Sequence, residues 1–153
     1  MTAVVSHENE LLLNTVQCFL NDEIYPHEDA VDRSGEVPLE LGRQIEARAK
    51  QMGLFAANLP EDVGGGGLNY TSSAIVEREY GKTTHALQSW IARPTELLLA
   101  CEGDQIARYL DPCVTGEKRE LFALTEPEAG SDVMGMKTNA KRDGHDWILN
   151  GSK

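Results

Sequence analysis

The sequence has few cysteines and no metal-binding arrangement of them. Its 153 residues include three, Cys18, Cys101 and Cys113, an odd number in which no pair has metal-ligand spacing. A disulfide framework and a cysteine metal site are therefore both disfavoured. We expect buried free thiols in a reducing compartment.

Long apolar runs are also missing. The longest, such as residues 97–101, fall far short of the roughly 20 apolar residues that cross a bilayer. The first ten residues carry two acids and no Lys or Arg. A secretory signal begins with basic residues and a transit peptide is rich in arginine. We expect no membrane span and a cytoplasmic location.

Positive charge is scarce. Lys and Arg number 14 against 25 Asp and Glu, which gives a formal net charge of −11. This balance argues against nucleic acid and an anionic membrane surface as partners. An anionic ligand would have to be held by local groups. Hydrophobic residues make up 41% of the chain, enough for a folded core at this length.

The first part of the chain shows helical periodicity with recognisable ends. Ser6 and Asn69 are suited to cap helices, Gly53 to end one, and Pro26 and Pro94 to kink or interrupt one. Apolar residues recur at helical spacing in five segments. The predicted helices are residues 7–32, 38–52, 70–80, 86–100 and 103–114.

Four consecutive glycines at 64–67 predict a loop, because glycine destabilises a helix or a strand through its loss of conformational entropy. A flexible turn is the simpler interpretation. A phosphate-binding loop is disfavoured, since no Lys-Ser/Thr follows and no clear strand precedes the glycines.

The period changes after the helices. Residues 121–124 and 147–149 are short apolar segments, and residues 136–141 alternate, as strands do. Asp143-Gly144 and Asn150-Gly151 are strong hairpin signals, and the second calls for a return strand. We therefore predict a mainly α chain, with a helical domain over 1–118 and the truncated beginning of a β domain over 119–153. We expect it to be a fragment of a larger enzyme.

Residues 124–132 carry the most specific pattern. Thr125 and Ser131 offer hydroxyls, Pro127 stiffens the turn and Gly130 allows close backbone approach. Composition alone favours a capped surface turn.

The order of residues changes this interpretation. Ala-Leu-Thr-Glu-Pro-x-Ala-Gly-Ser-Asp at 123–132, then Thr138, then Trp-Ile-Leu-Asn-Gly-x-Lys at 147–153, resembles the signature of the acyl-CoA dehydrogenase family. Upstream segments at 54–67, 77–79 and 109–117 are similar to family stretches as well. The resemblance implies an N-terminal helical bundle followed by the first strands of an incomplete β-barrel domain. It further implies a flavoprotein oxidoreductase of fatty acid metabolism.

The resemblance also assigns a cofactor site. Residues 122–131 would pack on the flavin of FAD, with Phe122 nearby and Leu124 and Thr125 bonding the polar edge of the ring. Gly130 belongs to the same turn, and Ser131 would bond an FAD phosphate or lie near the acyl-CoA substrate. Family helices matching 86–100 line the acyl cavity.

The family's catalytic glutamate lies in a C-terminal helical domain, so we expect the base beyond Lys153 and no catalytic residue within the chain. The fragment alone should be inactive. An electron-transferring flavoprotein is the expected acceptor, and the full-length protein should be a homo-oligomer. Alternatives are an acyl-CoA oxidase or flavin monooxygenase of the same fold, or a non-catalytic helical interaction module.

Overall fold

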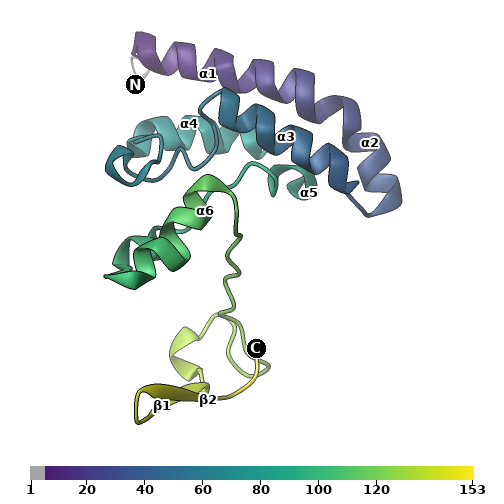
Figure 1. Cartoon of the computed structure of the whole chain (residues 1–153). Coiled ribbons are helices and arrows are strands. Elements are labelled where there is room, and N and C mark those ends of the chain that lie inside the picture. Colours follow the sequence, from purple (N-terminus) through teal and green to yellow (C-terminus); the bar gives the residue numbers. More distant parts are fainter. Residues whose placement is uncertain (1–5) are drawn as a thin grey trace. The chain divides into compact units, whose positions relative to one another are not determined.

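The computed structural model describes residues 6–153 and divides into two compact units, Met1–Glu120 and Leu121–Lys153. The first unit is helical, and the second holds a two-stranded sheet (Figure 1). The predicted fold class, mainly α with a short β portion at the end, is confirmed.

One continuous helical rod opens the first unit (Figure 1). It consists of α1 (His7–Phe19), a π-helical turn η1 (Leu20–Ile24) and α2 (Tyr25–Ser34). The Ser6 hydroxyl accepts a hydrogen bond from the Asn9 N–H at 3.2 Å, which confirms the predicted cap. Pro26 lies in the first turn of α2, where its missing N–H costs nothing.

Two further helices, α3 (Leu39–Gln51) and α4 (Tyr70–Tyr80), match their predicted ranges closely. Asn69 caps α4 by accepting from the Ser72 N–H at 3.0 Å, and Gly53 follows α3 at a left-handed φ of 69°. The core of this unit is formed by the fully buried side chains of Val16, Phe19, Leu20, Ile24, Ile45, Leu54, Leu59, Tyr80, Leu87 and Ile91.

The prediction of one long helix over residues 86–100 is wrong. The chain instead forms a single turn, α5 (His85–Gln88), an irregular stretch and a 3-10 helix, η3 (Glu96–Ala100). Pro94 cannot donate within a helix and disfavours helical backbone at the preceding residue, so the apolar periodicity runs across a break. The segment predicted over 103–114 contains η4 (Ile106–Leu110), a π-helical turn, and α6 (Asp111–Thr115).

The glycine loop is packed rather than flexible. It follows a 3-10 turn, η2 (Glu61–Val63), and its N–H groups are used internally. Gly65 donates to the Pro60 carbonyl and Gly67 to the Leu59 carbonyl, at 2.9 and 2.8 Å. A Cβ on Gly65 would come within 2.2 Å of that Leu59 oxygen. These donors are not free to hold phosphate.

The second unit contains a short 3-10 helix, η5 (Val133–Gly135), and an antiparallel hairpin of β1 (Asn139–Asp143) and β2 (Asp146–Asn150). Asp143 pairs with Asp146, so Gly144 and His145 form the two-residue loop, one position later than predicted. Gly144 supplies the left-handed φ of 61°.

No strand forms over residues 121–124, contrary to prediction. This segment is exposed, and among the described residues no neighbouring strand pairs with it. A β conformation needs a partner ladder to satisfy its backbone groups. Within residues 6–153, no helix is long and apolar enough to cross a bilayer.

Candidate functional site

The turn over residues 124–132 is closed by its own backbone. The Glu126 N–H donates to the Ala129 carbonyl at 3.0 Å, and the Ala129 N–H donates back to the Glu126 carbonyl at 3.2 Å. Both residues are buried, whereas their neighbours in the turn are exposed. Glu126 and Ala129 therefore form the buried, hydrogen-bonded inner side of the turn, and the exposed neighbouring residues form its outer side.

The Glu126 carboxylate fixes this turn to the following segment. It accepts hydrogen bonds from the N–H groups of Lys137 and Thr138 at 2.7 and 3.1 Å. Lys153 Nζ lies 3.0 Å from Oε1, the carboxylate oxygen that also accepts from the Thr138 N–H. Thr138, the Lys137 N–H and Lys153 together hold the pKa of Glu126 at about 2, well below its ordinary value. Glu126 is thus charged at neutral pH and holds the turn as a structural group.

Lys153 is the residue of this site to which the sequence interpretation gave no role. Besides meeting Glu126, its Nζ donates to the Leu124 carbonyl at 2.8 Å and lies 3.3 Å from the Met136 sulfur. Its position in the signature, two residues after Asn-Gly, was visible in the sequence. The contact with Leu124 depends on the folded turn and was not.

The five residues predicted to bind the cofactor lie in this turn or just before it, and all are exposed. Phe122 is 64% exposed and Leu124 is 36% exposed, and Thr125, Gly130 and Ser131 are exposed too. They lie close together along the sequence of unit 2, and none of the five is buried.

These residues carry groups that a flavin ring would need. Among the described residues, nothing accepts from the N–H groups of Leu124 and Thr125, so both donors are available for a polar ring edge. The exposed Phe122 and Leu124 side chains supply the apolar contact that a planar aromatic group needs. Gly130 has no atom within 4 Å of the position of an added Cβ, so close approach is open there.

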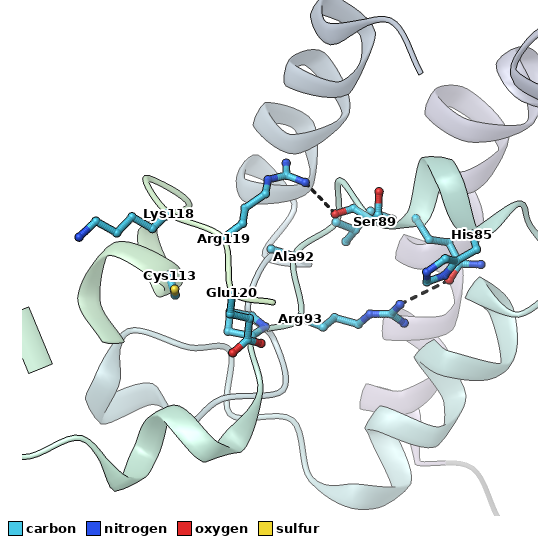
Figure 2. Close-up of a pocket in the computed structure, with 11 residues that line it drawn as sticks. His85, Ser89, Ala92, Arg93, Cys113, Lys118, Arg119 and Glu120 are labelled. Carbon is cyan, nitrogen blue, oxygen red and sulfur yellow. Dashed lines mark hydrogen bonds between the residues drawn. The ribbon is translucent and has the colours of Figure 1, made fainter. Parts of the chain in front are cut away.

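The helical unit contains a separate cavity of about 380 Å³ (Figure 2). Its wall comes from α5, the irregular stretch after it, α6 and the chain segment that ends the unit. The residues that line it include His85, Ser89, Ala92, Arg93, Cys113 and Arg119. Ile91 lines this cavity. Trp90 does not belong to its wall.

Backbone contacts from the glycine-loop region hold this wall in place. The Ala56 N–H donates to the Ala92 carbonyl at 2.9 Å, and Asn58 Nδ2 donates to the Pro94 carbonyl at 2.8 Å. Ala56 adopts a positive φ of 50°, which is uncommon for a residue other than glycine. The irregular stretch over 89–95 is therefore fixed by tertiary hydrogen bonds in place of a helical ladder.

Two guanidinium groups border the cavity. Arg93 donates to Glu77 at 2.5 Å and to the Gln88 side-chain oxygen at 3.4 Å. Arg119 donates to the Ser89 carbonyl at 3.1 Å and to Glu46 at 2.8 Å. Figure 2 shows the Arg93 side chain extending toward His85 and the Arg119 side chain toward Ser89.

All three cysteines are free thiols, as predicted, but they are not all buried. Cys18 is exposed, Cys101 is half-buried and Cys113 is buried in the cavity wall. Burial, with the nearby Glu120 carboxylate, raises the pKa of the Cys113 thiol. The prediction of burial was wrong for Cys18 because its place on the outer face of α1 leaves its side chain in water.

Comparison with known proteins identifies both units. The model of the acyl-CoA dehydrogenase N-terminal domain matches residues 6–117, and the model of the acyl-CoA dehydrogenase middle domain matches residues 121–153. The long-chain specific acyl-CoA dehydrogenase of Sus scrofa mitochondria is 37% identical over 98% of this chain and 35% of its own length. The CarC subunit of the caffeyl-CoA reductase–Etf complex of Acetobacterium woodii is 34% identical over 97% of this chain and 40% of its own length.

Solved structures agree. The Bacillus anthracis acyl-CoA dehydrogenase complexed with FAD superposes with a TM-score of 0.78 at 27% identity, over 99% of this chain and 26% of that one. The chain therefore spans well under half the length of each of these relatives.

Proposed function

Because this chain belongs to the acyl-CoA dehydrogenase family, we propose that it forms the N-terminal portion of an FAD-dependent enzyme that desaturates an acyl-CoA thioester between its α and β carbons. The observation that carries this proposal is the clamped turn over 124–132. Its inner side is fixed by Glu126, and its outer side presents two free N–H donors beside apolar side chains.

The family resemblance suggests roles for the turn residues, and their exposure supports these roles. The Leu124 and Thr125 N–H groups and the Thr125 hydroxyl would hydrogen-bond the polar edge of the flavin, while Phe122 packs nearby. Gly130 leaves room for close approach, and Ser131 would bond an FAD phosphate or the acyl-CoA. FAD, when bound, accepts the hydride that leaves the substrate. Donors aimed at the ring edge stabilise the negative charge that this transfer creates.

The cavity of the helical unit is our candidate for the acyl end of the substrate. The family resemblance implies that residues 86–100 line the acyl cavity, and the wall of the 380 Å³ cavity comes largely from residues 85–94. Its volume lies in the range of small-molecule sites.

Three parts of the proposal rest on the family alone. The base that removes the α-proton would be a glutamate outside residues 1–153. An electron-transferring flavoprotein would accept the electrons, in line with the relative that is named as part of an Etf complex. The full-length enzyme would be a homo-oligomer.

The proposal is tested on the full-length polypeptide that carries these residues. Anaerobic addition of acyl-CoA thioesters should bleach the flavin absorbance. Thr125→Val should slow bleaching by about tenfold or more, because a hydrogen bond that strengthens as charge develops is lost. Thr71→Val, at an exposed threonine on α4, is the matched control.

Absence of flavin from the purified protein, or equal bleaching by the Thr125→Val variant and wild type, would contradict this assignment. Peroxide formation during aerobic turnover would favour the oxidase alternative over the dehydrogenase.

A further inference from the structure

The helical unit contains a second, much smaller cavity, beside α4. Its volume is about 20 Å³, and Leu54, Ala57, Leu68 and Val76 form the apolar part of its lining. Arg93 lines both this small cavity and the 380 Å³ cavity described above. The small cavity therefore adjoins the irregular stretch that forms the wall of the larger one.

Two polar side-chain atoms are buried at the small cavity. Tyr80 Oη and Asn58 Oδ1 belong to residues that line it, and neither atom has a hydrogen-bond partner within residues 6–153. Tyr80 is 1% exposed, so bulk solvent does not reach its hydroxyl. An unpaired buried polar group is costly, and folded proteins pair nearly all of them with protein groups or with ordered water.

The two atoms have complementary roles. Burial raises the pKa of the Tyr80 phenol above its ordinary value, so the hydroxyl carries its proton at neutral pH and can donate it. The amide of Asn58 is oriented by its nitrogen, because Nδ2 donates to the Pro94 carbonyl at 2.8 Å. Asn58 Oδ1 is therefore an acceptor. One water molecule can accept from a phenol and donate to an amide oxygen at the same time.

The size of the cavity matches this ligand. A single water needs roughly 10–15 Å³, and the cavity offers about 20 Å³. Ser73 adds a further hydroxyl to the lining. We propose that the cavity binds one structural water, which accepts a hydrogen bond from the Tyr80 hydroxyl and donates one to Asn58 Oδ1.

This water supports the wall of the larger cavity. It extends the hydrogen-bonded chain from Tyr80 on α4 through Asn58 to the Pro94 carbonyl. The preceding residue, Arg93, contacts the same tyrosine, with its guanidinium 5.2 Å from the centre of the Tyr80 ring. α4 thus holds the irregular stretch at two consecutive residues, one through the ring and one through the water.

NMR on the whole, isotope-labelled 153-residue chain tests the site, with water itself as the probe. A water held for longer than the protein's tumbling time gives NOE and ROE peaks of opposite sign to nearby protons. We expect such peaks at the Asn58 side-chain amide and the Val76 methyl groups. Ser73→Ala removes the other hydroxyl of the lining, so the peaks should persist in this variant if they come from the bound water.

Stability measurements distinguish a bridged hydroxyl from an unpaired one. Tyr80→Phe should raise the unfolding equilibrium constant by about fivefold or more, because the water and Asn58 Oδ1 lose their donor. In a dry cavity the same change removes an unpaired hydroxyl, and stability stays the same or rises. Tyr70→Phe, at an 89% exposed tyrosine of α4, is the control and should change the constant by less than about twofold.

A double-mutant cycle adds a measurement that a direct contact cannot explain. The polar atoms of Tyr80 and Asn58 make no hydrogen bond to each other, yet a shared water couples them. Tyr80→Phe should therefore cost clearly less in an Asn58→Ala background than in the wild type.

Absence of water peaks at Asn58 and Val76, or their loss in Ser73→Ala, would overturn the proposal. So would a Tyr80→Phe variant as stable as the wild type, or additive effects in the cycle. Should the Tyr80 variant fail to fold, the spectra of the wild type and of Ser73→Ala decide alone. Neither measurement needs flavin or turnover, so a negative result leaves the proposed desaturase function standing.

Discussion

Lys153 Nζ lies 3.0 Å from the Glu126 carboxylate and donates to the Leu124 carbonyl at 2.8 Å, so one ammonium group joins the start of the turn to its buried anchor. Leu124 is a residue whose N–H we assign to the flavin edge. The Leu124 carbonyl shares one planar peptide group with the Thr125 N–H, which we also assign to the flavin edge, so the bond from Lys153 fixes the plane of that second donor. In the proposed enzyme, Glu126 and Lys153 would therefore act on the cofactor through the backbone that they position.

Glu126→Gln should loosen this turn. The neutral amide keeps one acceptor oxygen but points N–H donors at the Lys137 or Thr138 N–H, and the attraction to Lys153 is lost. Amide hydrogen exchange at Lys137 and Thr138 should accelerate by about tenfold or more. Glu128→Gln, in the same turn but with an exposed side chain, is the control. Unchanged protection in the Glu126 variant would show that the carboxylate does not hold the turn.

Acid should release the same clamp. Glu126 has its pKa lowered from the ordinary 4.5 to about 2 in the folded state, so its stabilising effect is complete above about pH 4.5 and disappears as the pH falls toward 2. Exchange protection at Lys137 and Thr138 should therefore fall over this window. A titration of the Glu126 carboxyl carbon with a midpoint near 4.5 would contradict the clamp.

The helix ranges were predicted correctly where capping or helix-ending residues mark the ends in the sequence. The predicted range of α4 was correct because Asn69 caps its start and Gly81 follows its last residue. The helix predicted over 86–100 failed because the stretch around Ala92 and Pro94 is fixed by Ala56 and Asn58, far away in the sequence. No periodicity in a window of residues reports such contacts.

The candidate site also has a part that local sequence signals predict and a part that depends on tertiary contacts. The residues of the turn were found because they are contiguous and their order is specific. The cavity was not found as a set of residues, because its wall combines residues 85–94 with Cys113 and residues 118–120, which only the fold brings together. From the sequence alone, Arg93 and Arg119 are interpreted as ordinary surface residues, and only the fold shows that both line the cavity.

Gly42→Ala should destabilise the helical unit although alanine is the better helix former. A Cβ at Gly42 would lie 2.1 Å from the Trp90 ring, so the ring must move. Overpacking of this kind costs about 1–3 kcal/mol, more than the gain in helix propensity of about 1 kcal/mol. Denaturant unfolding measures the change. Glu40→Ala, exposed on the same helix, should stay within about 0.5 kcal/mol of wild type.

The three thiols should react in order of exposure. Cys18 is exposed and should be alkylated by iodoacetamide first, while Cys113 is 6% exposed and its thiol pKa is raised by burial. Mass spectrometry of peptides after timed quenching should show Cys113 reacting on the order of a hundredfold more slowly than in denaturant. Similar rates at both residues in the folded chain would mean that the Cys113 side of the cavity wall opens readily.

Lys82→Gln should make the helical unit less tolerant of acid. The Glu79 carboxylate is 2% exposed, and the Lys82 ammonium at 2.5 Å, with Gln17 and Arg78, lowers its pKa despite burial. A depressed pKa means that this stabilisation is present above the ordinary carboxyl pKa and is lost as the pH falls. Without Lys82 the burial penalty remains and the largest favourable contact is gone, so the Glu79 pKa should rise. The loss of stability on acidification should then begin at higher pH.

At neutral pH the Lys82→Gln variant should lose about 1 kcal/mol, since Lys82 is itself half-exposed and water screens part of the interaction. Urea unfolding at several pH values and the carboxyl carbon shift of Glu79 measure both effects. Arg33→Gln breaks the exposed Arg33–Asp29 pair and should change neither the neutral-pH stability by more than about 0.5 kcal/mol nor the acid midpoint. A Glu79 pKa that is the same with and without Lys82 would mean that Gln17 and Arg78 suffice to hold the buried charge.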